Sequence, residues 1–101
     1  MSASPQRLVL RRDALTDLKE AFIWYEERRV GLGHEFMRAV RVQLSAIERA
    51  PEQFPMEVDD IRKAPLRHFP YIVFFVVLRR HASVIAVMHA RGNPRRWQAR
   101  R

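Results

Sequence analysis

Apolar residues recur every three or four positions along two segments in the first half of the chain, a spacing that places them on one face of a helix. The segments cover residues 14–29 and 34–49, and Asp13 is the expected N-cap of the first. Their apolar stripes are Leu15, Leu18, Phe22 and Tyr25 in the first helix and Phe36, Val40, Leu44 and Ile47 in the second. Gly31 and Gly33 lie in the short link between them, so the two helices are expected to form an antiparallel hairpin.

The remaining apolar segments are short and have the character of β-strands. They are expected at residues 6–12, 61–69, 71–78 and 84–90, with residues 51–60 as a loop and 79–83 as a turn. Residues 71–78 are apolar at all eight positions, which predicts a central strand buried on both faces. Pro65 cannot donate a backbone hydrogen bond, so its strand is expected to be an edge strand or to contain a bulge. Asn93 followed by Pro94 predicts a short C-terminal helical turn.

The expected element order is βααβββ. This is an α+β fold in which an antiparallel helical hairpin packs on one face of a small, mostly antiparallel sheet. The chain has 101 residues, of which 48% are hydrophobic and 30% charged, as expected for a single domain over residues 1–101. No segment has the ~20 apolar residues that cross a membrane, and the first residues lack the apolar core of a secretion signal. The chain contains no cysteine. These features predict a cytoplasmic protein without disulfides or thiolate metal sites.

The expected fold leaves apolar surface without an intramolecular partner. The hairpin covers one face of the sheet, whereas residues 71–78 are apolar on both faces, and Ile23 and Trp24 lie outside the stripe of the first helix. Exposed apolar patches usually mark an interface, so a protein partner is favoured. Its expected contacts are Ile23, Trp24, Tyr71, Val73 and Phe75. The alternative is that a terminal segment or Trp97 covers the sheet, and that Ile23 and Trp24 extend the core.

Charge is distributed unevenly along the chain. The formal net charge is +8, and residues 51–101 contain ten Lys and Arg against four Asp and Glu, with no acidic residue after Asp60. Every cation except Lys19 and Lys63 is an arginine, whose planar guanidinium suits carboxylates and phosphates. This half of the chain indicates a negatively charged partner, either nucleic acid or an acidic protein surface. The alternative is a basic protein without a functional basic face.

The last expected strand leads into the cationic sequence HARGNPRRW, residues 89–97. Alternation along a strand would place His89 and Arg91 on one face, so Arg91 is expected to be held rigidly at the strand end. The expected target-binding residues all have guanidinium side chains and are Arg62, Arg67, Arg91, Arg95 and Arg96. Trp97 is expected to be a structural anchor on the sheet, and Arg100 and Arg101 to be a solvated tail.

Four segments of the chain, in this order, resemble the RelE/ParE superfamily, the toxins of type II toxin–antitoxin systems. They are AFIWYEERRVGLGHEF, PEQFP, IRKAPLRHFPYIVFF and HARGNPRRW, and the resemblance covers nearly the whole chain. It implies a small basic toxin that an acidic cognate antitoxin neutralises by wrapping its helices and sheet. A homodimer, or a heterotetramer with the antitoxin, is the implied assembly.

The superfamily has two branches with different targets. RelE-like members are ribosome-dependent endoribonucleases that cut mRNA, whereas ParE-like members inhibit DNA gyrase without known catalysis of their own. Against the ribonuclease pattern, Lys63 and Arg91 match basic positions. Pro65 and Ile72 stand where the ribonucleases carry cations, and Trp97 stands where they carry a tyrosine. The ribonuclease set is therefore incomplete, which favours the ParE-like branch.

A ribonuclease would need groups that accept and donate protons and cations that stabilise the phosphate. Other ribonuclease members use histidine, and His68 and His89 lie near the basic positions. If the chain is a ribonuclease, its candidate catalytic residues are Lys63, His89 and Arg91; otherwise these histidines pack or cap. We expect a protein that is not an enzyme and needs no cofactor. The four histidines lack metal-site spacing, so no metal is expected.

Overall fold

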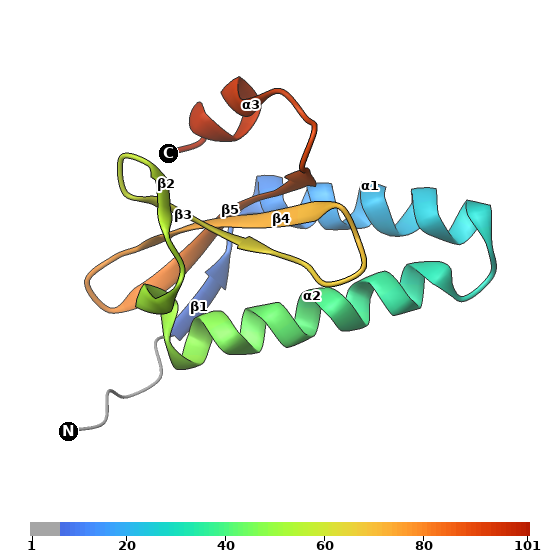
Figure 1. Ribbon diagram of the computed structural model, residues 1–101, viewed down its shortest axis with the longest axis horizontal. Helices are drawn as coiled ribbons and strands as arrows, with labels where there is room; N and C mark the ends of the chain where they lie inside the picture. The colour runs from blue at the N-terminus through green and yellow to red at the C-terminus, as the bar shows by residue number, and fades with distance from the viewer. Residues whose placement is uncertain (1–6) are drawn as a thin grey trace.

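The computed structural model describes residues 7–101, so the first residue of the expected strand 6–12 lies outside the described part. The elements in chain order are β1 (Arg7–Leu10), α1 (Arg12–Arg28), α2 (Leu32–Arg49), the short 3-10 helix η1 (Pro51–Gln53), β2 (Met56–Val58), β3 (Ile61–Pro65), β4 (Tyr71–Val77), β5 (His81–His89) and α3 (Pro94–Gln98). The strands form one sheet in the order β1-β5-β4-β3-β2. β1 is parallel to β5, and the other pairs are antiparallel. The predicted α+β fold is confirmed (Figure 1).

The sheet contains one strand more than the sequence predicted. Residues 56–58 were expected in a loop but form β2, which pairs with β3. β3 is therefore an inner strand rather than an edge strand. Pro65 is tolerated because it is the last residue of β3 and lies beyond the residues that pair with β2. The prediction that the segment after it is a central strand is confirmed, since β4 lies between β3 and β5.

The buried stripe of α1 agrees with the prediction at Leu18 and Tyr25 but not at Leu15. Leu15 is 54% exposed, and the buried face consists of Ala14, Asp17, Leu18, Ala21 and Tyr25. The helix begins at Arg12, so Asp13 is not its N-cap but lies in the first turn, where its charge favours the positive end of the helix. The stripe of α2 agrees with the prediction at Phe36, Val40 and Ile47.

The link between α1 and α2 depends on two glycines and Glu26. Gly31 has φ of 93°, a conformation that favours glycine. A Cβ on Gly33 would lie 2.8 Å from the carbonyl oxygen of Phe22, so glycine permits this close approach of the helices. The carboxylate of Glu26 accepts hydrogen bonds from the N–H groups of Gly31 and Gly33, both at 2.8 Å. These bonds satisfy donors that the start of α2 would otherwise leave unpaired.

Glu26 makes the hairpin link sensitive to acid. The Gly31 hydrogen bond is the main reason that the pKa of Glu26 lies below its ordinary value of 4.5. A carboxyl with a lowered folded pKa contributes stability above its unfolded pKa and loses it as the pH falls through the folded pKa. Glu26→Gln should therefore lower the melting temperature at neutral pH, and its difference from the parent protein should shrink on acidification. Thermal unfolding across pH measures this, with Glu27→Gln as the control. A difference that does not change with pH would contradict the assignment.

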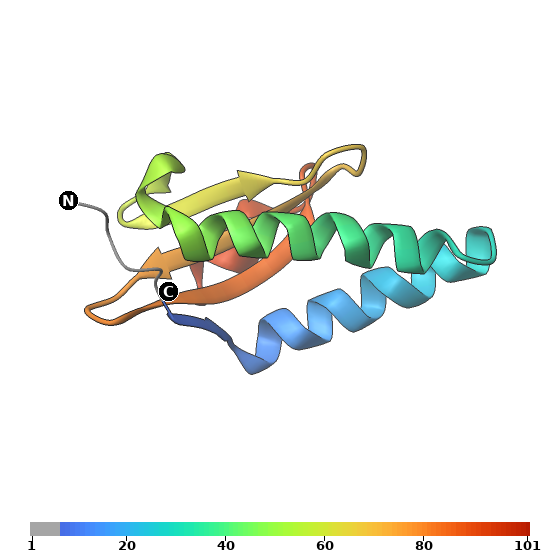
Figure 2. The same ribbon diagram turned by 90° about the horizontal axis from the view of Figure 1, so that it is seen from below.

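The sheet has an apolar layer on each face. Val73 and Phe75 of β4 are fully buried in the layer beneath α1 and α2. On the other face, Trp97 of α3 is 6% exposed and stacks on Phe74 with ring centroids 4.1 Å apart. α3 thus lies across the sheet from α2 (Figure 1), while the joined ends of α1 and α2 extend beyond the sheet (Figure 2). The expectation that this second face is free for a partner is wrong, because α3 covers it.

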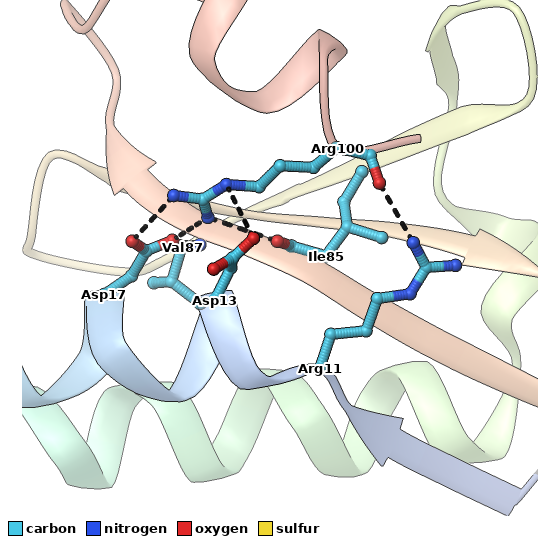
Figure 3. A network of polar contacts seen from close by, with 6 residues as sticks. All are labelled: Arg11, Asp13, Asp17, Ile85, Val87 and Arg100. Carbon is cyan, nitrogen blue, oxygen red and sulfur yellow. Dashed lines mark hydrogen bonds and ion pairs between the residues drawn. The ribbon is translucent and has the colours of Figure 1, made fainter.

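The C-terminal residues are fixed to the fold. As predicted, Asn93 caps α3, since its side-chain oxygen accepts the Arg95 N–H at 3.0 Å. Arg100 donates to both carboxylate oxygens of Asp17 on α1 and, at 3.2 Å, to the carbonyl oxygen of Ile85 (Figure 3). Arg101 forms an ion pair with Asp60. The expectation of a solvated tail at residues 100 and 101 is therefore wrong.

The open edge of β5 explains why Arg100 and Asp17 meet there. β1 pairs with β5 only as far as Val84, and beyond that residue the edge of β5 must find other hydrogen-bond partners. Asp17 accepts the N–H of Val87 at 3.0 Å, and Arg100 donates to the carbonyl oxygen of Ile85. The side chain of Arg11 in turn donates to the Arg100 carbonyl oxygen at 2.9 Å (Figure 3). The side chains of Asp17 and Arg100 thus provide hydrogen-bond partners for the part of the β5 edge that β1 does not reach.

Candidate functional site

The residues expected to serve a ribonuclease are not brought together. Lys63 of β3 pairs with Phe74 of β4 and forms an ion pair with Glu57 at 2.9 Å. His89 of β5 pairs with Tyr71, three positions away along β4, which places Lys63 and His89 on opposite faces of the sheet. Arg91 lies in the turn after β5 and donates its backbone N–H to Nδ1 of His89 at 3.0 Å. The expectation that Arg91 is the rigid end of a strand is wrong, because β5 ends at His89.

Four of the five arginines expected to bind the target are exposed. They are Arg67, Arg91, Arg95 and Arg96. The side chain of Arg62 instead donates to the carbonyl oxygens of Phe54 and Glu52, at 2.6 and 3.4 Å. The N–H of Ala90 donates to the carbonyl oxygen of Pro70 at 2.8 Å. This bond holds the β3–β4 loop beside the turn after β5, so Arg67 and Arg91 belong to the same end of the sheet.

A cleft with aromatic walls lies between α1 and this end of the sheet. It consists of two depressions of about 230 and 380 Å³ that share Trp24, Tyr71 and His89, and we call it the aromatic cleft. Trp24 is 48% exposed, and the guanidinium of Arg28 lies 3.7 Å from its ring centroid. The rings of Tyr71 and His89 lie edge to face, with their centroids 5.5 Å apart. Arg96 also lines the cleft, so planar rings and a cation converge on one space.

The carboxylates of α1 shape the electrostatics of the aromatic cleft. Burial, and secondarily the charges of Asp17 and Glu20, raise the pKa of the Tyr71 phenol above its ordinary value. The phenol is therefore neutral at physiological pH. Asp17 is compensated by Arg100, whose pKa is raised chiefly by the hydrogen bond to Asp17. Glu20 lies one helical turn before Trp24 and is exposed. Asp17 and Glu20 are the two carboxylates that line the cleft, and of these Glu20 has no partner among the ion pairs of residues 7–101.

A second depression lies on the other side of the hairpin. This α2 groove, of about 590 Å³, is bordered by α2 and the β3–β4 loop. Leu32, Val42 and Phe69 supply apolar surface, and Arg38 and Arg67 supply positive charge. Val42 is 64% exposed. The β3–β4 loop thus borders the α2 groove through Arg67 and Phe69 and the aromatic cleft through Pro70, one on each flank of the hairpin.

The surroundings of Trp24 were not predicted, although the sequence contained part of the signal. Glu20, Trp24 and Arg28 are spaced by four residues, so they lie on one flank of a helix. Phe22, whose ring meets that of His34 on α2, lies two residues before Trp24 and therefore about 200° around the helix, toward α2. The four-residue spacing therefore shows that these three side chains share one flank of the helix. It cannot show that Tyr71, His89 and Arg96 lie beside them, because that depends on the tertiary fold.

Residues 7–101 show neither a metal-binding cluster nor a membrane-spanning helix. None of their His, Asp and Glu side chains form a group of three or more that could hold a metal ion. No helix in this part of the chain is long and apolar enough to cross a membrane.

A helical hairpin on one face of a mostly antiparallel sheet, with exposed arginines at one end, is the architecture expected for the toxins that the sequence resembles. The family model described as the ParE toxin of the parDE type II toxin–antitoxin system matches residues 8–94. The chain belongs to this ParE toxin family. A solved structure described as the chromosomal ParDE toxin–antitoxin system from P. aeruginosa has a TM-score of 0.76 at 18% identity, covering 86% of this chain and 98% of that chain. That likeness supports the fold. The search of curated proteins found no match.

Proposed function

We propose that this ParE-family toxin inhibits DNA gyrase as a binding protein and that an acidic cognate antitoxin neutralises it. Gyrase is favoured over mRNA as the target because the candidate catalytic residues of a ribonuclease lie apart in the fold. Lys63 is paired with Glu57 on the face of the sheet opposite His89. Acid–base cleavage of RNA needs its groups within hydrogen-bond reach of one substrate. Binding to gyrase needs no such constellation, no metal and no cofactor.

The proposed gyrase-facing surface is the basic end of the sheet. Its residues are the exposed arginines Arg67, Arg91, Arg95 and Arg96. Arg62 is left out because its side chain is engaged with two carbonyl oxygens. The β3–β4 loop and the turn after β5 are joined by a backbone hydrogen bond, which supports a common surface.

The proposed antitoxin surface is the pair of flanks of the helical hairpin. Ile23 and Trp24 of α1 are 45% and 48% exposed, and Val42 lies exposed in the α2 groove. Arg38 and Arg67 border that groove, where they would meet acidic side chains of an amphipathic segment. Tyr71 remains a proposed contact at the aromatic cleft. Val73 and Phe75 do not belong to this surface, because they are fully buried beneath the hairpin.

The gyrase proposal predicts a specific loss of inhibition on removal of Arg91. Purified toxin is expected to inhibit gyrase-dependent supercoiling without cleaving mRNA on ribosomes. Arg91→Ala should raise the concentration for half-inhibition by about tenfold or more, as expected for the loss of a hydrogen bond to a charged group. Arg79→Ala is the matched control, because Arg79 is an exposed arginine in the β4–β5 turn, at the other end of the sheet. Codon-dependent cuts in ribosome-bound mRNA, or equal effects of the two substitutions, would contradict the proposal.

A further inference from the structure

We propose that the aromatic cleft binds an unpaired nucleotide of a single nucleic-acid strand. In this arrangement the base stacks between Trp24 and Tyr71, and Arg91 and Arg96 hold the adjoining phosphates. The inference rests on the proposed function for the source of the strand, which would be the DNA on which gyrase acts. It adds a contact with nucleic acid to a toxin so far described as a binder of protein.

The walls of the cleft suit a flat heterocycle. Trp24, Tyr71 and His89 line both depressions, so the same three rings border each of them. Every nucleobase has a π-face that can stack on such rings, irrespective of its sequence. Trp24 is half exposed although it is the largest side chain on its helix, and it lines both depressions. The guanidinium of Arg28 lies over one face of its ring, so the opposite face is the one proposed to stack on a base. An unpaired base would cover that surface.

The charges around the cleft suit a phosphate backbone on one side. Arg96 lines the cleft, and Arg91 lies two residues after His89. Neither side chain takes part in the five ion pairs found among residues 7–101. Arginine beside exposed aromatic rings is typical of surfaces that bind single strands, where cations follow the backbone and rings stack the bases.

The carboxylates of the cleft restrict the orientation of the strand. Asp17 does not oppose phosphate as a free charge, because Arg100 engages both of its oxygens. Glu20 remains, and it would repel a phosphate on the α1 side of the cleft. A carboxylate can instead accept a hydrogen bond from the amino group of a base. The base therefore points toward α1 and the backbone toward the turn after β5.

Double-stranded nucleic acid does not suit this site. In a duplex the faces of the bases are covered by their neighbours, and only the edges are accessible in the grooves. A base can lie between Trp24 and Tyr71 only if it has left the stack, and this costs least in a strand that is already single. The site therefore selects single strands. Because Trp24 is also a proposed antitoxin contact, strand and antitoxin would exclude one another.

The test measures binding of labelled oligonucleotides to purified toxin in the absence of gyrase. Fluorescence anisotropy would compare DNA and RNA single strands of about ten nucleotides with a duplex of the same length. We expect the toxin to bind single strands at least about tenfold more tightly than the duplex, and Trp24→Ala to remove about tenfold of the single-strand affinity. Ile23→Ala is the matched control, because Ile23 is equally exposed but is not part of the cleft lining.

Further variants separate stacking from charge. Trp24→Phe should retain part of the affinity, because a smaller ring still stacks. Arg96→Ala should reduce the dependence of binding on salt by about one phosphate contact, whereas Arg79→Ala should reduce it less. Equal affinity for duplex and single strand, or equal losses for the Trp24 and Ile23 variants, would overturn the site.

The oligonucleotide arms also separate this inference from the gyrase proposal. Tight binding of single-stranded DNA agrees with both. A strong preference for RNA supports the nucleotide site and counts against gyrase as the source of the strand. Inhibition of supercoiling by a toxin that shows no preference for single strands would leave the gyrase proposal standing and refute the nucleotide site.

Discussion

Arg100→Ala is expected to lower the free energy of unfolding by about 2–4 kcal/mol, slightly less than the loss typical of a broken buried ion pair. The substitution leaves Asp17, which is 8% exposed, with a charge that no longer has a cationic partner. It also removes the donor to the Ile85 carbonyl oxygen at the open edge of β5. The expected loss is smaller than that for a fully buried ion pair because the side chain of Arg100 is still 19% exposed. Urea-induced unfolding followed by circular dichroism measures the change.

Arg101→Ala is the matched control for this prediction. Arg101 also forms an ion pair, with Asp60, but both partners are largely exposed, and such pairs contribute little to stability. In addition, the double variant Asp17→Ala with Arg100→Ala should lose less stability than the sum of the two single variants, because the residues act as a pair. If Arg100→Ala were as mild as Arg101→Ala, the C-terminal residues would be a solvated tail after all.

The helices and the central strand could be predicted because their signals are local. Apolar residues at helical spacing identified α1 and α2, and the unbroken apolar run identified β4. The buried face of α1 was predicted only in part, because Leu15 is apolar yet exposed and Asp17 is charged yet buried. A hydrophobicity pattern cannot find a buried carboxylate whose partner lies 83 residues away. β2 was missed because three residues carry too little periodicity to be recognised.

The candidate site was predictable in its residue types but not in its grouping. Trp24 was identified because it lies outside the apolar stripe, and the arginines because no acid follows Asp60. Tyr71 and His89 meet Trp24 only through strand pairing and the packing of α1, which are long-range features. Arg62 was predicted to bind the target, but its side chain is engaged within the fold, because η1 and the segment after it supply carbonyl oxygens within its reach. Contacts of this kind depend on tertiary structure.

Trp97→Ala is expected to cause the largest loss of stability, about 3–5 kcal/mol, as for other buried aromatic side chains truncated to alanine. Trp97 is the one described residue of α3 that is buried, and its ring stacks on Phe74. Without that ring, α3 has little to hold it against the sheet, and the apolar layer formed by Phe74, Val76 and Ile85 would become accessible to water. The variant should therefore unfold at lower urea and bind a hydrophobic dye.

The second tryptophan provides the control. Trp24→Ala removes a side chain of the same size from a half-exposed position, so it should change the free energy of unfolding far less than Trp97→Ala. The two variants should also lose function for different reasons. Trp24→Ala is expected to lose strand and antitoxin binding while the fold persists, whereas Trp97→Ala should lose activity in proportion to the fraction of unfolded protein. Equal losses of stability for the two variants would mean that Trp97 does not anchor α3, and that other contacts cover the second face of the sheet.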